Sequence, residues 1–191
     1  MSASDNLSIG WEVTAEHLDR KPSARVLAMG GVNSIGLYVA DFARALGVRE
    51  VIYCDTSERR LAIAKRLGVT PHAGVPDMNI GTFDLSVDAA CDPAGLRRAI
   101  MALEPEAVCE SVGIYFSDVP FPTLAMYSRS VRFPTAKGNA SHAMGPVLSM
   151  VVEKKVRPDL IHSVVRPWEA AAEELGASDK PVFTRAPIMC E

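Results

Sequence analysis

The feature that most constrains the fold of this chain is the stretch of residues 25–55, which reads RVLAMGGVNSIGLYVADFARALGVREVIYCD. An apolar run at residues 26–29 has the length of a buried strand, and a glycine-rich turn follows it. From Ile35 the apolar residues recur at helical spacing as far as Gly47, and residues 51–54 form a second apolar run. A strand, a glycine turn, a helix and a second strand predict a βαβ unit, an arrangement that often binds dinucleotides.

The same alternation of strand-like and helix-like patterns continues to the end of the chain. Residues 11–18 carry apolar side chains at helical spacing, so we expect residues 1–24 to form a leading helical segment. We predict an α/β fold with a doubly wound, mostly parallel sheet and helices on both faces (a Rossmann fold), in one domain over residues 1–191. Further strands are expected at residues 85–90, 107–112, 131–135, 161–165 and 181–184, further helices at residues 58–67, 93–103, 147–152 and 168–175, and irregular connections at residues 73–82 and 114–130.

Composition narrows the classes of partner. The chain has 191 residues, 48% of them hydrophobic, and a formal net charge of -3, which suits one globular domain with a sizeable core. It has no apolar run that approaches the roughly 20 residues needed to cross a bilayer. Its first residues lack the basic segment and the apolar segment of a signal peptide. No cluster of lysine and arginine is interleaved with aromatic residues. We therefore expect neither nucleic acid nor a membrane as a partner, and a cytoplasmic location.

Polar residues in apolar surroundings give further expectations. The four cysteines are scattered without a CxxC pair, which favours reduced thiols packed in the core. The four histidines form no HxxxH or HExxH pair, which favours structural roles for them. Glu110 interrupts the apolar run AVCESV, and a carboxylate on a buried strand needs a partner or a raised pKa.

The glycine turn departs from the ideal dinucleotide motif at one position. Matching GxGxxG from its last glycine puts Gly31, Asn33 and Gly36 in the three key places, so the middle glycine is missing. Asparagine tolerates a positive φ better than most residues, so the turn can keep its shape. The amides of Ser34 and Ile35 would open the helix towards phosphates at its positive end. A glycine turn of this kind also occurs for packing alone.

Asp55 strengthens the interpretation of that turn as a dinucleotide site. It stands at the carboxyl end of the second strand, about 20 residues after the turn, where a carboxylate accepts both hydroxyls of an adenosine ribose. An acid there repels a 2′-phosphate, which favours NAD over NADP. Arg59 and Arg60 follow closely and weaken that preference, since arginines can hold the extra phosphate. The alternative role for Asp55 is the N-cap of the next helix.

Several segments along the chain carry a family resemblance. They read VLAMGGVNSIGLYVADFARALG, DTSERRLAIAKRLG, FDLSVDAACDPAGL, ESVGI, and HSVVRPWEAAAEEL before KPVFTR. Together they resemble the cofactor-binding domain of the medium-chain dehydrogenase/reductase family, which includes the zinc-containing alcohol dehydrogenases. The resemblance covers nearly the whole chain. It implies a Rossmann fold, hydride transfer between a nicotinamide and a small alcohol or carbonyl substrate, and a homodimer formed through the edge of the sheet.

The resemblance also implies a place for each part of the cofactor. The pyrophosphate would lie on residues 31–35 and the adenosine ribose on Asp55, with Arg60 near that ribose. Val112 and Ile114 would back the nicotinamide, although ordinary core packing accounts for these two residues equally well. The implied cofactor-binding residues are Gly31, Val32, Asn33, Ser34, Ile35, Gly36, Asp55, Thr56, Arg60, Ala90, Cys91, Val112, Gly113, Ile114 and Lys180, the last in the place of a basic residue that can reach the pyrophosphate.

The resemblance leaves the chemistry incomplete. In the family a catalytic domain with most of the zinc ligands precedes the cofactor-binding domain, and this sequence begins after it. Asp5 stands where the family places its third catalytic zinc ligand, but one carboxylate cannot form a site that needs about three protein ligands. A solvated residue near the terminus is the alternative for Asp5. We therefore expect no catalytic residue here, zinc only in the complete enzyme, and a chain that binds cofactor without turnover.

Rival functions are separated by motifs. Short-chain dehydrogenases need a Tyr-x-x-x-Lys pair, which none of the four tyrosines provides, and no GxxxxGK[ST] sequence forms a P-loop. A Rossmann-like methyltransferase shares the glycine turn and the acid after the second strand, so it stays as a lesser alternative. A stand-alone dinucleotide-binding module or sensor is the main alternative from another class, and a degenerate domain kept for subunit contacts is a third.

Overall fold

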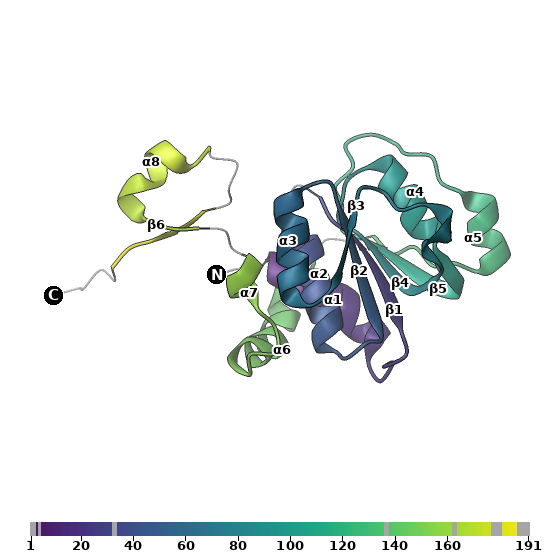
Figure 1. Ribbon diagram of the computed structural model, residues 1–191, viewed down its shortest axis with the longest axis horizontal. Coiled ribbons are helices and arrows are strands. Elements are labelled where there is room, and N and C mark those ends of the chain that lie inside the picture. Colours follow the sequence, from purple (N-terminus) through teal and green to yellow (C-terminus); the bar gives the residue numbers. More distant parts are fainter. Residues whose placement is uncertain are drawn as a thin grey trace.

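A five-stranded parallel sheet forms the centre of the molecule (Figure 1). The computed structural model describes residues 3, 5–31, 34–135, 138–161, 164–176 and 181–186. The strand order is β3-β2-β1-β4-β5, and each neighbouring pair is parallel. The strands are β1 (Arg25–Met29), β2 (Glu50–Asp55), β3 (Thr70–Ala73), β4 (Phe83–Asp88) and β5 (Leu103–Ser111). The chain winds outward from β1 in both directions, which confirms the predicted doubly wound topology.

Helices cover both faces of this sheet because successive residues of each strand point to opposite sides. In β1, Val26 and Ala28 join one apolar cluster, whereas Leu27 and Met29 join the other. Figure 1 shows the first three helices on one side of the sheet and α4 and α5 on the other. The helices concerned are α1 (Asn6–Leu18), α2 (Ile35–Ala45), α3 (Glu58–Leu67), α4 (Pro93–Met101) and α5 (Thr123–Arg129).

The helix ends follow the predicted capping signals. Gly68 ends α3 in the left-handed conformation with a φ of 84°, which suits a residue without a side chain. The Asp92 side chain accepts a hydrogen bond from the Gly95 amide, and Pro93 is the first residue of α4. At the start of α3 the N-cap is Ser57, whose side chain accepts from the Arg60 amide, so Asp55 does not hold that role.

Several segments differ from the sequence-based expectations. β3 was not predicted, and the segment expected to be irregular at residues 114–130 contains α5. The expected strand at residues 131–135 makes only two bridges to β5, because Pro134 has no N–H for a continuous ladder. Residues 168–175 begin as a 3₁₀ turn, η3 (Trp168–Ala170), and continue as α8 (Ala171–Glu174). A short 3₁₀ turn, η2 (Met78–Ile80), lies within the predicted connection at residues 73–82.

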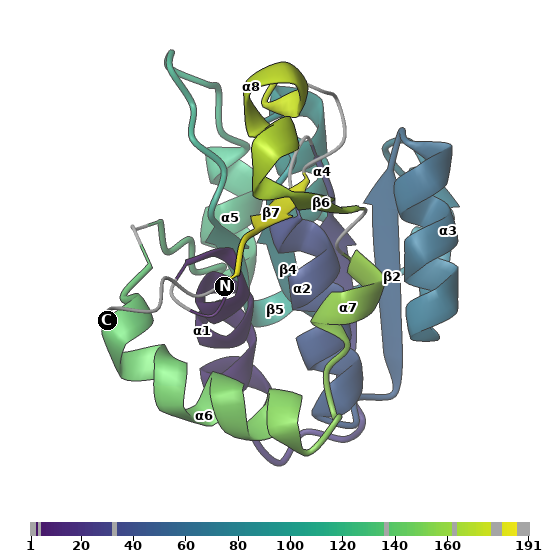
Figure 2. The same ribbon diagram turned by 90° about the vertical axis from the view of Figure 1, so that its left-hand side faces the viewer.

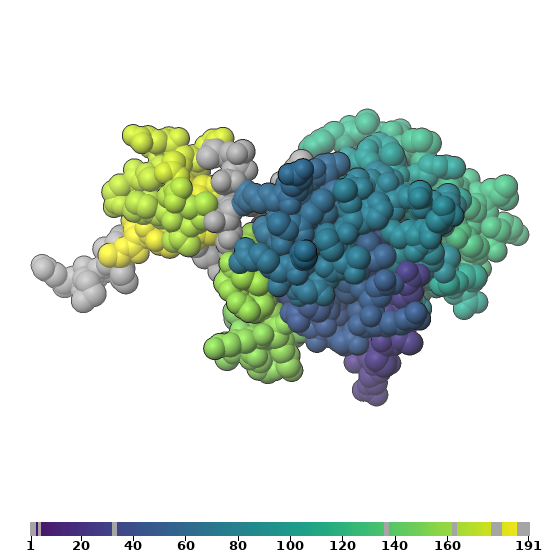
Figure 3. Space-filling view, viewed as in Figure 1, coloured from purple at the N-terminus to yellow at the C-terminus, as the bar shows by residue number. Residues whose placement is uncertain are grey.

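The last described segments form a small unit of their own. The expected strand at residues 161–165 is replaced by the end of α7 (Pro158–Ile161) and the start of β6 (Val165–Pro167), with residues 162–163 outside the described part. β6 pairs in parallel with β7 (Val182–Thr184). Figure 1 shows this pair and α8 to one side of the main sheet, and in Figure 3 the same yellow part of the chain stands to one side of the other residues. Figure 2 shows α6 (Ala140–Val152) beside α1, and α7 beside α2.

Glu110 has the partner that its position requires. Nε2 of His17, on α1, lies 2.6 Å from Oε1 of Glu110 on β5, and both side chains are 16% exposed. The pair links the leading helix to the sheet, which gives His17 the structural role expected of it. Within the described parts of the chain, no helix is long and apolar enough to span a membrane.

Close packing of α1 against α2 depends on Gly10. A Cβ at this position would lie 2.8 Å from the Tyr38 Cβ and 3.2 Å from the Val39 amide nitrogen. The Val39 nitrogen is a backbone atom and the Tyr38 Cβ is bonded directly to the backbone, so no side-chain rotation can move either atom away. α1 therefore approaches α2 more closely than any residue with a side chain would allow.

We predict that Gly10→Ala lowers the free energy of unfolding by about 1–3 kcal/mol, because over-packing outweighs the better helix propensity of alanine. Urea unfolding followed by circular dichroism measures the change. Gly176→Ala is the control, since a Cβ there meets no atom within 4 Å. Equal stability of both variants would show that α1 does not pack on α2 in this way.

Candidate functional site

The carboxyl ends of the parallel strands bring the expected site residues to one edge of the sheet. Gly30 follows β1, Asp55 ends β2, Asp88 ends β4 and Ser111 ends β5. β1 lies between β2 and β4, and the chain leaves β1 towards β2. In open parallel sheets ligands bind at such a switch point, outside the carboxyl ends of the strands.

Glycine is required at two positions of the turn, because neighbouring backbone atoms lie where a side chain would begin. A Cβ on Gly31 would lie 2.6 Å from the Ala89 carbonyl oxygen, and one on Gly36 would lie 2.9 Å from the Gly30 Cα. Gly36 therefore lets α2 pack closely on the end of β1, and close packing of helix on strand is the role of the third glycine in this motif. Val32 and Asn33 lie outside the described residues, so their predicted contacts stay predictions.

The amino end of α2 is directed at the same edge. Ile35 is its first residue, and the preceding Ser34 makes no side-chain cap to the helix. The first turn contains no acidic residue, so no carboxylate of that turn offsets the partial positive charge of the helix end. Such an end favours an anion, which agrees with the predicted place of the pyrophosphate.

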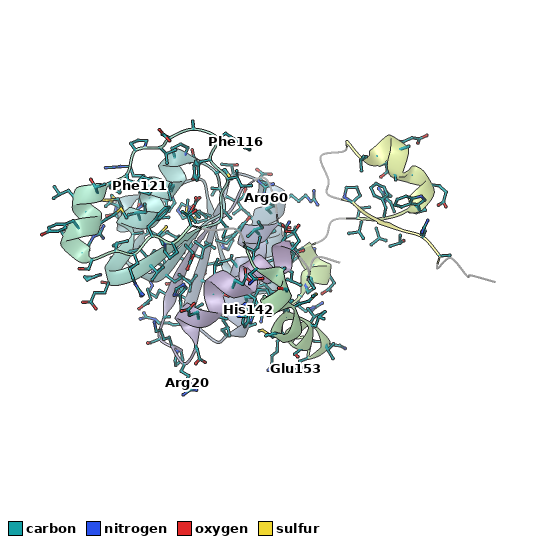
Figure 4. All side chains as sticks on the ribbon, turned by 180° about the vertical axis from the view of Figure 1, so that it is seen from behind. Arg20, Arg60, Phe116, Phe121, His142 and Glu153 are labelled. Atoms are coloured by element: carbon teal, nitrogen blue, oxygen red, sulfur yellow. The ribbon has the colours of Figure 1, made fainter. Side chains whose placement is uncertain are left out.

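The Asp55 carboxylate is not exposed to solvent but accepts hydrogen bonds from several neighbouring groups. Arg60 Nε donates to its Oδ2 at 2.7 Å and Arg60 Nη2 to its Oδ1 at 2.8 Å. Tyr53 Oη donates to Oδ2 at 2.5 Å, and the Ser57 amide donates to Oδ1 at 2.8 Å. The Asp55 side chain is 1% exposed and that of Arg60 is 27% exposed. The guanidinium therefore covers the carboxylate, and Figure 4 shows Arg60 at the same side of the molecule as Phe116, in the loop after β5.

The donors determine the charge of this group. Burial by itself would raise the pKa of Asp55, but the hydrogen bonds from Arg60, Tyr53 and Ser57 together hold that pKa below its usual value. Burial and the neighbouring Asp55 raise the pKa of Tyr53, so its hydroxyl stays protonated and donates. Asp55 and Arg60 therefore form an ion pair at neutral pH.

Tyr53 fills the space beneath the glycine turn. Its side chain is fully buried, and a Cβ on Gly36 would lie 3.2 Å from its Cε2 atom. A Cβ on Gly30 would lie 2.5 Å from its Cζ atom and 2.6 Å from Oδ2 of Asp55. The ring thus joins the turn to the acidic residue, a link that sequence reasoning did not identify.

The ends of β4 and β5 lie against each other. A Cβ on Gly113 would be 3.3 Å from the Cys91 amide nitrogen, and the Ala90 amide donates to Oδ1 of Asp88 at 3.1 Å. Val112 packs partly buried against the apolar core, whereas Ile114 is 69% exposed. Core packing therefore accounts for Val112, as the alternative in the sequence analysis allowed, but not for Ile114.

The remaining predicted residues fall into three groups. Thr56 is exposed beside Asp55, and Cys91 is an exposed thiol rather than a buried one. Lys180 lies outside the described residues. Asp5 is exposed at the start of α1, and among the described residues no three His, Cys, Asp or Glu side chains gather where they could hold a metal ion. The described residues therefore do not fit a zinc site by themselves.

Comparison with known proteins gives one family match and several relatives. A family model described as zinc-binding dehydrogenase matches residues 34–153. L-threonine 3-dehydrogenase of Saccharopolyspora erythraea is 34% identical over 80 residues, 37% of this chain and 23% of the relative. L-idonate 5-dehydrogenase (NAD(P)(+)) of Escherichia coli K12 is 22% identical over 126 residues, 62% of this chain and 37% of the relative.

Solved structures support the fold. An alcohol dehydrogenase from Thermus sp. ATN1 superimposes with a TM-score of 0.81 at 24% identity, over 92% of this chain and 53% of that one. An alcohol dehydrogenase from Escherichia coli CFT073, solved with NADH, gives a TM-score of 0.78 at 18% identity, over 90% of this chain and 53% of that one. The chain spans about half the length of these structures and a smaller share of the curated relatives.

We predict that Asp55→Asn lowers the free energy of unfolding by about 2 kcal/mol at pH 7, because a charged hydrogen-bond partner of Arg60 and Tyr53 is lost. The pKa of Asp55 is lowered by folding, so its contribution is complete above the ordinary value of 3.8 and is lost as the pH falls through the folded-state pKa. The difference between wild type and variant should therefore shrink below pH 3.8.

Urea unfolding at several pH values between about 3 and 7 measures this difference. Asp159→Asn is the control, because it breaks an ion pair with Arg157 that is exposed on both sides, and it should change stability little. A difference for Asp55→Asn that stays constant with pH would contradict the ion pair.

Proposed function

The chain belongs to the zinc-binding dehydrogenase family, and from this premise we propose that it is the NAD-binding domain of an alcohol dehydrogenase-like oxidoreductase. The observation that carries the proposal is the Asp55–Arg60 pair, at the carboxyl end of β2 and in contact with the glycine turn through Tyr53. The complete enzyme would move a hydride between the nicotinamide and a small alcohol or carbonyl compound. By itself the chain binds cofactor and does not turn over substrate.

The described residues divide the work of holding the cofactor. The amino end of α2 would receive the pyrophosphate, because the partial positive charge of a helix amino end suits an anion. Asp55 and Arg60 would receive the adenosine ribose. Both Asp55 oxygens are occupied, so a ribose hydroxyl can donate to the carboxylate only when the partly exposed Arg60 side chain moves aside. The bound cofactor supplies the hydride chemistry.

Charge favours NAD over NADP in this proposal. A 2′-phosphate placed at Asp55 would meet a buried carboxylate that is ionised at neutral pH, and like charges repel. Arg60 reduces this repulsion because its guanidinium already pairs with the carboxylate. We therefore propose a preference for NAD of modest size rather than an absolute one.

The proposal extends to the complete enzyme and its assembly. Residues 1–191 would form one cofactor-binding domain, joined in the complete enzyme to the segments that bind substrate and zinc, with Asp5 as a contributor to that zinc site. The segment at residues 131–135, which makes two bridges to β5 at the edge of the sheet, would form the contact of a homodimer. We further propose a cytoplasmic location, without nucleic acid or membrane partners.

Calorimetric titration with NAD and NADP tests the cofactor proposal. We predict saturable binding of both, with NAD the tighter ligand. Absence of binding of either at millimolar concentration would overturn the proposal. The measurement needs only the chain itself, since no turnover is required.

Asp55→Asn tests the source of the preference. The variant keeps the shape of the side chain and removes its charge, so NAD should bind about tenfold more weakly, about 1.4 kcal/mol, while NADP changes less. The control is Asp84→Asn, which makes the same change in charge at the amino end of β4, where Asp84 accepts from the Arg25 amide. A ratio of NAD to NADP affinity that is unchanged in Asp55→Asn would remove Asp55 as its cause.

A further inference from the structure

A buried polar cluster at the ends of β4 and β5 has no role in the contacts proposed so far. Asp88 is fully buried, and its Oδ2 accepts from Ser111 Oγ at 3.0 Å and from Tyr115 Oη at 2.9 Å. The Ala90 amide donates to the other oxygen at 3.1 Å. A buried carboxylate is costly unless its oxygens are hydrogen-bonded, so these donors are held where they are by Asp88.

The backbone of Asp88 binds the same segment. Its carbonyl oxygen accepts from the Val112 amide at 2.9 Å and from the Gly113 amide at 3.2 Å. Side chain and backbone of one residue therefore contact four of the five positions in residues 111–115. Ser111 is the last residue of β5 and also bridges Thr135, and residues 112–115 leave the sheet after it. Asp88 accepts the hydrogen bonds of the Val112 and Gly113 amides and of the Tyr115 hydroxyl there, so it defines much of the course of these residues.

The surroundings leave the segment little freedom. A Cβ on Gly113 would lie 3.1 Å from Oδ2 of Asp88 and 3.3 Å from the Cys91 Sγ atom. Cys91 itself has a φ of 56°, a left-handed conformation that residues with side chains seldom adopt. Such a conformation persists where neighbouring contacts over-determine it, and it is commoner at functional sites.

The charge state of the cluster follows from its position. Burial raises the pKa of Asp88, while the hydrogen bonds from Tyr115, Ala90 and Ser111 oppose that rise. Burial and the neighbouring Asp88 raise the pKa of Tyr115, so the phenol keeps its proton and donates. The link between Tyr115 and Asp88 is thus a hydrogen bond with a defined donor.

We propose that Asp88 is a positioning residue for the nicotinamide half of the cofactor, an inference that rests on the function proposed above. Through Ser111 and Tyr115 it fixes residues 112–114, the segment expected behind the nicotinamide. Asp88 is buried, so it acts through these residues and does not touch the ligand. The adenosine half is held at Asp55 on β2, which β1 separates from β4, and it should not depend on Asp88.

Tyr115→Phe tests this role, because it keeps the ring and removes only the hydroxyl, which lies 2.9 Å from Oδ2 of Asp88 and 3.3 Å from the Asp92 carbonyl oxygen. NADH and ADP-ribose, which lacks the nicotinamide, are the two probes. We expect the variant to bind NADH about fivefold more weakly, with a smaller change in NADH fluorescence on binding, and ADP-ribose within twofold of wild type. Tyr127→Phe on α5 is the control, since Tyr127 is 85% exposed, and it should change neither affinity.

Asp88→Asn and the double variant extend the test. If Asp88 and Tyr115 act through the same hydrogen bond, their effects on affinity should not add. The double variant should then bind NADH about as tightly as whichever single variant has the lower affinity. Equal losses for NADH and ADP-ribose would indicate a merely structural role and overturn the inference, as would NADH binding that Tyr115→Phe leaves unchanged. A wild-type chain that binds neither ligand would overturn the proposed function itself, and with it this inference.

Discussion

Every feature of the candidate site depends on the parallel pairing of β1 with β2 and β4. In this arrangement the strand ends meet at one edge, so Asp55, at the end of β2, and Asp88, at the end of β4, lie on either side of the glycine turn after β1. A shift of one residue in either pairing would turn these carboxylates to the other face of the sheet. The register of three strands therefore fixes the distance between the carboxylates of Asp55 and Asp88, which lie 33 positions apart in the sequence.

The buried carboxylates of Asp55 and Asp88 are stabilised by different partners. Asp55 pairs with a partly exposed arginine and stays ionised with a lowered pKa, so it remains available to a polar ligand when Arg60 moves. Among the described residues the donors to the Asp88 carboxylate are neutral, and burial raises the pKa of Asp88. One group is thus suited to exchange partners with a ribose, and the other is suited to hold a loop in place. This difference underlies the separate roles that we propose for them.

Much of the fold could be predicted from the sequence because its signals are local. The apolar runs of β1 and β2, the helical spacing after Ile35, and the caps at Asp92 and Gly68 each lie within a few residues of the element that they define. β3 and α5 were missed because their own patterns are weak: β3 contains a proline, and α5 has no buried residue. Packing on the rest of the molecule, which a local pattern does not encode, stabilises such elements.

The candidate site could be predicted only in part, for a similar reason. Asp55 could be predicted because it ends the apolar strand that follows the glycine turn. Asp88 also ends an apolar strand, β4, but no motif beside it indicates a function. The hydroxyls that bind Asp88 come from Ser111 and Tyr115, 23 and 27 positions away. The occupation of Asp55 by Tyr53 and Arg60 depends on side-chain rotamers that a sequence does not specify.

The most direct test of this account is to map where NAD binds by two-dimensional ¹H–¹⁵N NMR of the labelled chain. The account predicts that the largest shifts fall on amides at residues 30–31, 34–36, 55–57, 88–91 and 112–114, which lie at the carboxyl edge of the sheet. A rival location exists in the hollow of about 800 Å³ between α1 and α6, which Trp11 and His142 line. Shifts concentrated there, with the carboxyl edge unchanged, would contradict the account.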